Sequence, residues 1–256
     1  MANKLTASER KFLQSLHQRK YRYKYSSFLI EGKKTVIEAL RSHYEIKNLY
    51  LSSNLPELEI KEIIGNNKSK FTLNFIKFSD LESVSTLKNP EGVLAVASIT
   101  KTTRQLKDIS DLPAVYLWKI NDPGNLGTII RTALWFGIDT IFTSPDSVDI
   151  YNPKVIRSSM GAIFNTEIIH DVDFADIMEY KNRLKARLYC THMGGKDTTT
   201  VLNNSWITIF GSESHGLPQQ ILSSADEIIG IPQRGAGESL NLAVSVGIIL
   251  NELTKY

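Results

Sequence analysis

The chain has 256 residues, enough for one large domain or two modest ones with their own cores. Its hydrophobic and charged fractions, 42% and 22%, are ordinary for a globular protein, and no apolar run approaches the roughly 20 residues of a membrane span. A single cysteine, Cys190, excludes an intramolecular disulfide and an all-cysteine metal site. Because Met1 to Arg10 lack the apolar stretch of a signal peptide, we expect a cytoplasmic protein.

The net charge of +3 conceals an uneven distribution along the chain. Residues 1–100 hold 16 Lys and Arg against 10 Asp and Glu, whereas the remainder holds 14 against 17. A basic first part followed by a mildly acidic second part indicates that the first part meets a polyanion. Charge alone does not identify that polymer.

The first hundred residues predict a small domain of helices and strands. Thr6 and Glu9 have the spacing of a capping box, so a helix should begin there. Strands are then predicted at 28–30, 46–51, 71–78 and 93–99, with helices at 33–40 and 58–64. Residues 101–112 are polar and aperiodic, which predicts a linker between a first domain at 1–100 and a second at 113–256.

Beyond the linker, strand and helix patterns alternate. Strands are predicted at 114–118, 140–143, 166–169, 187–191, 206–210 and 227–231, and helices at 127–136, 153–159, 174–184 and 239–253. The last helix carries Leu240, Val244 and Ile248 on one face. The alternation predicts an α/β fold with a mainly parallel sheet.

Three Gly-rich loops in this second part follow apolar runs of strand length. They occupy residues 121–131, 210–217 and 231–241, and the first and third lead into helical sequence. Open α/β sheets bind ligands at the carboxyl ends of their strands. The third loop contains Gly235-x-Gly237, but Leu240 stands where a dinucleotide-binding fingerprint needs its last glycine. The sequence has no Walker motif and no metal-ligand spacing of its histidines.

The order and composition of these loops resemble the signature motifs of the SpoU-type (TrmH-like) RNA ribose 2′-O-methyltransferases of the SPOUT class. The resemblance implies a trefoil knot near the C-terminus, whereas general connectivity rules predict an unknotted sheet. It also implies S-adenosylmethionine as cofactor, no metal, and a homodimer with the site at its interface. The implied substrate is RNA, with ribosomal RNA favoured over transfer RNA, and the first domain resembles a small αβ substrate-binding domain similar to certain ribosomal proteins.

Site residues are implied by their positions in the three loops. The implied catalytic residues are Asn125, Arg131, Glu213, Ser239 and Asn241. The implied cofactor-binding residues are Gly211, Ser212, Gly216, Leu217, Ile231, Pro232, Gly235, Ser239 and Leu240. Many family members have Gly where this chain has Ser214, a side chain that the loop accommodates if φ is negative there.

Several of these residues also have a structural alternative. Arg131 lies one helical turn beyond Gly127 and suits a phosphate through its planar fork, or else a surface ion pair. Whether it also removes the proton of the 2′-OH stays open. Glu213 could be a solvated acid in a tight turn, and Ser239 could cap the last helix.

Residues 19–25 interleave cations with tyrosines. Proteins hold single-stranded RNA by combining phosphate attraction with base stacking. The predicted RNA contacts are therefore Arg19, Lys20, Arg22 and Lys24, together with Arg131. The alternative is a solvated helix end whose tyrosines pack inward.

Two other functional classes stay open. Ser214 and Gly216 form part of a nucleophile elbow whose first glycine is replaced by Ser212, so a serine hydrolase is one alternative. An RNA-binding module without activity is the other, and the joint presence of all five implied catalytic residues argues against it.

Overall fold

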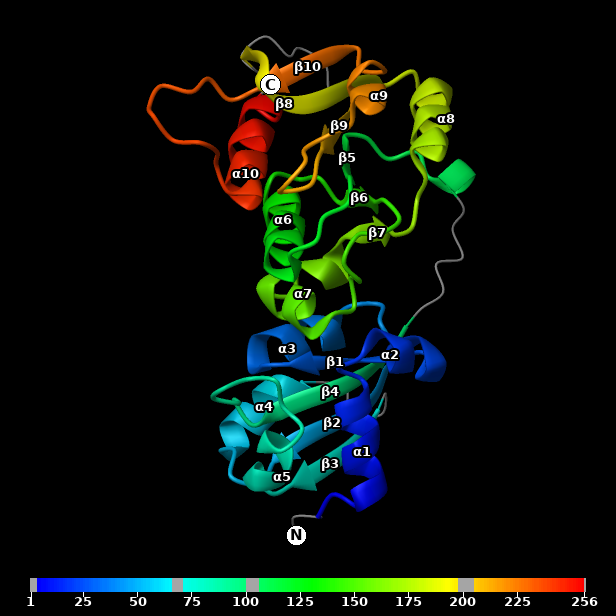
Figure 1. Ribbon diagram of the computed structural model, residues 1–256. Coiled ribbons are helices and arrows are strands. Elements are labelled where there is room, and N and C mark those ends of the chain that lie inside the picture. The colour runs from blue at the N-terminus through cyan, green and yellow to red at the C-terminus, as the bar shows by residue number, and fades with distance from the viewer. Residues whose placement is uncertain (1–3, 66–70, 100–105, 198–204, 256) are drawn as a thin grey trace. The chain divides into compact units, whose positions relative to one another are not determined.

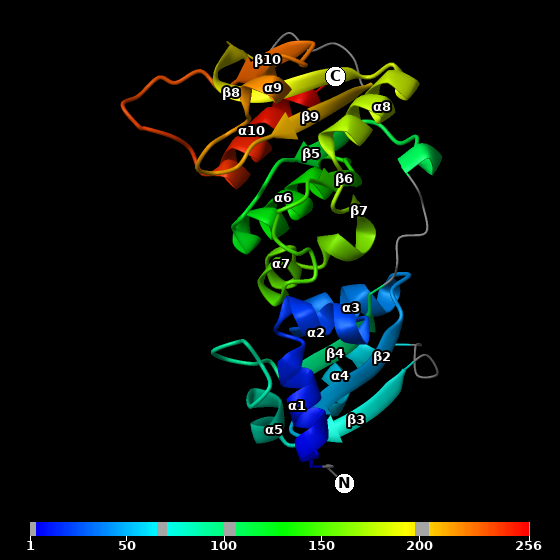
Figure 2. The same cartoon turned by 45° about the vertical axis from the view of Figure 1, so that its right-hand side comes forward.

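The structure, a computed structural model, describes residues 4–65, 71–99, 106–197 and 205–255 (Figures 1 and 2). It divides into two compact units. The first combines Met1–Lys101 with Asp149–Phe164, and the second combines Thr102–Val148 with Asn165–Tyr256. The sequence did not predict the place of Asp149–Phe164 in the first unit, and the domain boundaries at 100 and 113 stay predictions.

The first unit contains a mixed four-stranded sheet in the order β1-β4-β2-β3. Strand β4 (Val93–Ser98) is antiparallel to β1 (Ser27–Glu31) and to β2 (Ile46–Ser52), whereas β3 (Thr72–Ile76) is parallel to β2. Its helices are α1 (Ala7–Ser15), α2 (Arg19–Tyr25), α3 (Lys33–Arg41), α4 (Glu57–Ile64), α5 (Phe78–Glu82) and α7 (Pro153–Ser158).

The predicted elements of the first unit are present, with one correction. The strand predicted at 71–78 ends at Ile76, because Lys77 is the N-cap of α5 and Phe78 is its first residue. The capping box that begins α1 is confirmed: Thr6 Oγ1 accepts from the amide of Glu9 at 3.2 Å, and Glu9 accepts from the amide of Thr6 at 2.9 Å.

The second unit is built on a six-stranded sheet in the order β10-β8-β9-β5-β6-β7, and every neighbouring pair is parallel. Its strands are β5 (Ala114–Leu117), β6 (Thr140–Thr143), β7 (Glu167–Ile169), β8 (Arg187–Asp197), β9 (Trp206–Phe210) and β10 (Glu227–Gly230). Its helices are α6 (Pro123–Trp135), α8 (Phe174–Leu184), α9 (Gln219–Leu222) and α10 (Leu242–Leu253). These elements confirm the mainly parallel α/β fold; the trefoil knot stays a prediction.

The sheet of the second unit is covered on both faces, as a parallel sheet requires. Helices α6 and α10 lie side by side on one face, and α8 lies on the other (Figures 1 and 2). Under α8 the core contains Tyr116, Phe142, Leu188 and Ile207, all fully buried. Across the described ranges, none of the helices is long and apolar enough to span a bilayer.

The start of α10 differs from the sequence prediction. The helix begins at Leu242, and its N-cap is Asn241, whose Oδ1 accepts from the amides of Ala243 and Val244 at 2.9 and 3.3 Å. The prediction that Ser239 caps this helix is therefore wrong.

The apolar face predicted for α10 is the one that solvent reaches. Leu240, just before the helix, is 52% exposed, and Val244 and Ile248 are 51% and 39% exposed. The opposite face, with Ala243, Val246, Ile249, Leu250 and Leu253, is buried.

A buried ion pair joins α2 to the Asp149–Phe164 segment of the same unit. The side chain of Arg22 is 2% exposed, and its Nε donates to Asp149 Oδ2 at 2.9 Å. Its Nη1 donates to the carbonyls of Leu16 and His17 at 3.0 and 2.9 Å. Asp149 also accepts from the hydroxyl of Tyr23 at 3.2 Å. With its guanidinium enclosed in this way, Arg22 is not available to a phosphate, so its predicted role as an RNA contact is wrong.

Aromatic side chains continue the contact between this segment and the rest of the first unit. The ring centroids of Phe28 and Tyr151 are 4.7 Å apart, and those of Tyr44 and Phe164 are 5.3 Å apart. Gly161 approaches Glu38 so closely that an added Cβ would lie 2.6 Å from Glu38 Cγ. The segment is therefore packed as part of this unit's core.

Replacing Arg22 with alanine should lower the free energy of unfolding of the first unit by ~3–5 kcal/mol, because Asp149 would become an uncompensated buried charge. Arg19→Ala, at an exposed position of the same helix, is the matched control and should change stability by less than about 0.5 kcal/mol. Hydrogen exchange of the α2 and β1 amides measures both. Equal protection in the two variants would contradict a structural role for the pair.

Candidate active site

The three Gly-rich loops begin at the carboxyl ends of strands β5, β9 and β10. Strands β5 and β9 are neighbours, with Leu117 opposite Phe210, so the first and second loops start side by side. This is the edge of an open parallel sheet at which ligands bind. The geometry places Asn125 of the first loop within reach of Glu213 of the second.

The first loop is shorter than predicted because α6 begins at Pro123 rather than near Gly127. Asp122 is the N-cap, and its Oδ1 accepts from the amide of Asn125 at 2.8 Å. Proline suits the first helical position, since the N–H that it lacks has no partner there. Asn125 therefore lies in the first turn of α6, where backbone N–H groups and the helix dipole favour a negative charge.

Glu213 supplies that negative charge. Its Oε1 accepts from Asn125 Nδ2 at 2.9 Å and from the amide of Asp122 at 3.4 Å, and its Oε2 accepts from the amide of Asn121 at 3.4 Å. Asn125 Oδ1 in turn accepts from Asn241 Nδ2 at 3.0 Å. Glu213, Asn125 and Asn241 thus connect the three loops, and Glu213 is more than a solvated acid.

The donors and acceptors of this network allow one arrangement only. An ionised carboxylate accepts and does not donate, so Asn125 must turn its amide nitrogen toward Glu213. Its oxygen then faces Asn241, which must present nitrogen there because its own oxygen caps α10.

The second loop is a tight turn that depends on two glycines. Ser212 and Gly216 exchange backbone hydrogen bonds of 3.3 and 2.9 Å, and Gly216 has φ +62°. A Cβ added to Gly211 would lie 2.3 Å from the carbonyl carbon of Gly216. Ser214 has no positive φ, so its side chain causes no strain.

The third loop, residues 231–240, has no regular secondary structure and is exposed except for the half-buried Ile231. Gln233 Nε2 donates to the carbonyls of Gly235 and Gly237 at 2.8 and 2.6 Å. Of the predicted cofactor contacts, Pro232, Gly235, Ser239 and Leu240 lie on this exposed stretch, and Ser239 does not join the network.

Sequence reasoning missed two glycines before this loop. A Cβ on Gly195 would lie 2.3 Å from the carbonyl carbon of Ile229, and one on Gly230 would lie 2.4 Å from the carbonyl oxygen of His192. Strands β8 and β10 therefore meet backbone to backbone where the third loop begins. The Gly194-Gly195 pair, which lies inside β8, was the available signal, because glycine within a strand often marks a close approach of another backbone.

Arg131 lies on the exposed side of α6, one turn beyond Gly127. Within the ranges that the structure describes, its guanidinium has no ion-pair or hydrogen-bond partner. The surface ion pair considered from the sequence is thus not formed, and its charge is open to a ligand.

Comparison with known proteins identifies the class. Residues 112–251 match the SpoU rRNA Methylase family, and residues 9–95 match the MRM3-like substrate binding domain. The chain therefore belongs to the SpoU rRNA methylase family, as its three loops predicted. Membership makes it an RNA methyltransferase, so the serine hydrolase and the module without activity are wrong. Ser214 Oγ does contact His215 Nδ1 at 2.9 Å, but among the described residues no carboxylate pairs with that histidine.

Relatives cover nearly the whole chain. The 23S rRNA (guanosine(2553)-2'-O)-methyltransferase RlmP of Bacillus subtilis is 28% identical, with 93% of this chain and 92% of that protein covered. Mouse mitochondrial rRNA methyltransferase 3 is 25% identical, over 91% of this chain and 68% of that protein. The crystal structure of an AdoMet-bound rRNA methyltransferase from Sinorhizobium meliloti is 27% identical with a TM-score of 0.86, covering 98% of this chain and 97% of the other.

Gly211→Ala should impair cofactor binding, because its Cβ would force the turn away from Gly216; overpacking of this kind costs ~1–3 kcal/mol. Gly247→Ala in α10 is the matched control, since its added Cβ would meet only Thr132 Cγ2, at an ordinary contact distance of 3.6 Å. Calorimetric titration with S-adenosylmethionine, alongside a thermal melt, compares them. If Gly211→Ala binds the cofactor as the wild type does, the second loop does not form its site.

Proposed function

We propose that this chain transfers the methyl group of S-adenosylmethionine to a ribose 2′-OH of ribosomal RNA. The observation that carries the proposal is the Glu213–Asn125–Asn241 network, which joins three loops at the carboxyl edge of a parallel sheet. Family membership supplies the class of reaction, and the rRNA methyltransferases among the relatives favour ribosomal over transfer RNA. Action in the cytoplasm and the trefoil knot belong to the same proposal.

The second and third loops fit the cofactor through their backbone. Gly235 and Gly237 have open space where a Cβ would lie, so a ligand can approach their peptide groups closely. Gly211, Ser212, Gly216, Leu217, Ile231, Pro232, Ser239 and Leu240 would complete this set of contacts. When bound, S-adenosylmethionine supplies a sulfonium methyl group as the electrophile.

The polar residues position the acceptor. Methyl transfer is an in-line displacement, so the hydroxyl must be aligned and water excluded. Arg131 clamps the adjacent phosphate through two directed hydrogen bonds. Asn125 Nδ2 has two hydrogens, one of which goes to Glu213, so the other can bind a substrate oxygen. A guanidinium is a poor base, and Glu213 is already engaged with three donors, so we assign proton removal to assistance from the substrate phosphate.

The active form is proposed to be a homodimer. Leu240, Val244 and Ile248 expose an apolar row along α10, and Trp135, 85% exposed, ends the adjacent α6. Contiguous exposed apolar surface of this kind marks interaction sites. Arg131 is on the same exposed side of α6 as Trp135, one turn earlier, so a second copy packed here would bring its surface to the site.

Arg131 should be the most sensitive single side chain for transfer. Because a clamp needs the planar fork, Arg131→Lys should fail nearly as badly as Arg131→Ala, each losing about 100-fold or more in rate. Cofactor binding should persist, since other loops hold it. Single-turnover transfer beside cofactor calorimetry separates the two. Near-normal transfer by Arg131→Ala would overturn the site assignment, and absence of cofactor binding by the folded wild type with RNA present would overturn the function.

Cations of α2 should contribute to RNA affinity. Replacing Arg19, Lys20 and Lys24 with glutamine should weaken binding and lower the slope of log K against log salt by about 2, if each cation neutralises one phosphate of a single strand. Lys61→Gln on α4 is the control, because Lys61 is exposed but pairs with Glu57. An unchanged salt slope in the triple variant would show that α2 is only a solvated helix.

A further inference from the structure

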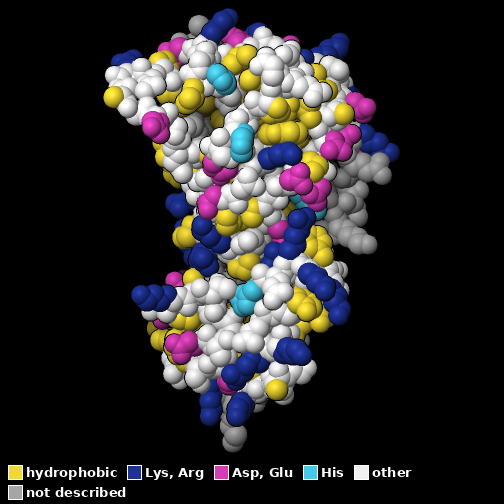
Figure 3. All heavy atoms as spheres, in the orientation of Figure 1, with side chains coloured by type: hydrophobic (Ala, Val, Ile, Leu, Met, Phe, Trp, Pro, Cys, Tyr) yellow, Lys and Arg dark blue, Asp and Glu magenta, His cyan; other side chains and the backbone are white. Residues whose placement is uncertain are grey.

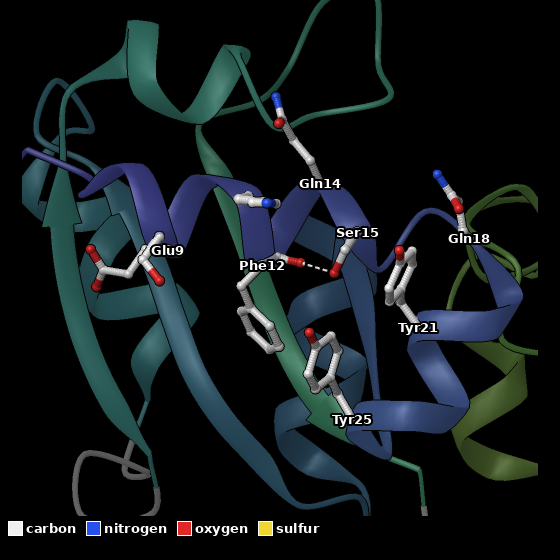
Figure 4. A pocket seen from close by; sticks show the side chains of 9 residues that line it. Glu9, Phe12, Gln14, Ser15, Gln18, Tyr21 and Tyr25 are labelled. Atoms are coloured by element: carbon white, nitrogen blue, oxygen red, sulfur yellow. Dashed lines mark hydrogen bonds between the residues drawn. The ribbon is translucent and has the colours of Figure 1, made fainter.

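A groove of about 820 Å³ lies between α1 and α2 in the first unit (Figure 4). It exists because the chain bends between the helices: α1 ends at Ser15, and Gln18 has extended backbone before α2 begins at Arg19. Each helix is anchored to the rest of the first unit. The α1 end is anchored by the buried side chains of Leu13 and Leu16, and α2 is anchored by the Arg22–Asp149 pair. The groove is therefore a preformed concave surface.

Three aromatic rings line this groove. The rings of Tyr21 and Tyr25 are nearly parallel, at 15° with centroids 6.2 Å apart, and Phe12 meets Tyr25 edge-on at 5.2 Å and 72° (Figure 4). Tyr25 is nevertheless 40% exposed. These rings are oriented by their neighbours and are still accessible to a ligand. Because their side chains are already ordered, stacking a ligand on them costs little further conformational entropy.

The surroundings of the rings favour an anion. Lys20 Nζ lies 5.9 Å from the Tyr21 centroid and Lys24 Nζ 5.5 Å from that of Tyr25, and Lys11 is exposed on the wall. Glu9 is the acid of the groove, and its carboxylate is engaged by the amide and hydroxyl of Thr6 at 2.9 and 2.7 Å. Figure 3, which shows one face, agrees with this excess: over this unit Lys and Arg are more widespread than Asp and Glu.

Side-chain amides are available beside the rings. Gln14 Nε2 donates to the carbonyl of Ser83 at 2.9 Å, which leaves its amide oxygen as an acceptor. Gln18 provides no side-chain cap to α2, and among the described residues its side-chain amide has no hydrogen-bond partner. An amide can donate to or accept from the edge of a nucleobase.

We propose that the groove between α1 and α2 receives an unpaired base of the substrate RNA, stacked on Tyr21 and Tyr25, with Lys20 and Lys24 on its flanking phosphates. The inference rests on the proposed function, because it assumes an RNA substrate. Bases in a duplex hide their faces, so the groove selects loops or single strands. An RNA fits better than a peptide because the first 25 residues carry seven Lys and Arg against one acid.

The test uses the full chain and a short single-stranded oligonucleotide whose only base is one 2-aminopurine, the other positions being abasic. Stacking on tyrosine should quench the fluorescence of that base. Tyr21→Leu with Tyr25→Leu should weaken binding by ~5- to 150-fold, the factor that corresponds to ~1–3 kcal/mol per stacked base. Tyr21→Phe with Tyr25→Phe keeps the rings and should bind like the wild type, which also controls for folding.

A probe of the same length that is abasic at every position completes the cycle. This probe keeps the phosphates but offers no base to stack. The wild type should therefore bind it as weakly as the leucine variant binds the 2-aminopurine probe. The leucine variant should bind both probes equally. Equal binding of both probes by the wild type overturns the proposal. Wild-type affinity of the leucine variant for the 2-aminopurine probe also overturns it, and is the result expected if the groove docks a protein instead. Calorimetric titration of the wild type with S-adenosylmethionine tests the proposed function separately, because the cofactor is assigned to loops of the second unit and the groove lies in the first.

Discussion

The carboxylate of Glu213 is the acceptor around which the loops of the second unit are arranged. It accepts from Asn125 and from two backbone amides at the start of α6, where the helix dipole favours a negative charge. Because Asn125 Nδ2 donates to Glu213, the amide oxygen of Asn125 faces Asn241; without Glu213 this orientation of the amide would not be fixed. Because Asn241 also caps α10, the turn after β9 and the starts of two helices are held in one hydrogen-bonded unit.

A second constraint acts within the first unit. The Arg22–Asp149 pair is fully enclosed, and such pairs often stabilise less than apolar packing of the same volume would. What this pair supplies is a defined position for α2, since only one placement of the helix satisfies the guanidinium. The Asp149–Phe164 segment leaves β6 and returns to β7, so the chain passes between the units three times rather than through a single linker.

Local signals were readable from the sequence. The capping box at Thr6, the alternation of strands and helices, and the three loops after strands depend on residues close together in the chain, and the structure has them. The position of Asn125 was less clear, because Asp122-Pro123 begins α6 earlier than the apolar pattern does. Ser239 was a reasonable cap, but Asn241 lies closer to the first helical residue and takes that role.

What the sequence could not provide are pairings between distant residues. Arg22 looks like its neighbours Arg19, Lys20 and Lys24, and only a partner 127 residues away makes it a core residue. The exposed face of α10 is another case: periodicity reveals that Leu240, Val244 and Ile248 share a face, but the packing of α6 decides which face the monomer buries. The close approach of Gly195 and Gly230 likewise depends on the neighbouring strands.

The most direct test of the central claim is a map of 2′-O-methylation in ribosomal and transfer RNA from cells with and without the gene. The account predicts that deletion removes methylation at a ribosomal RNA position, that the wild-type gene restores it, and that Glu213→Ala does not, because Asn125 and the start of α6 lose their acceptor. Identical maps with and without the gene would contradict the account, as would full restoration by Glu213→Ala.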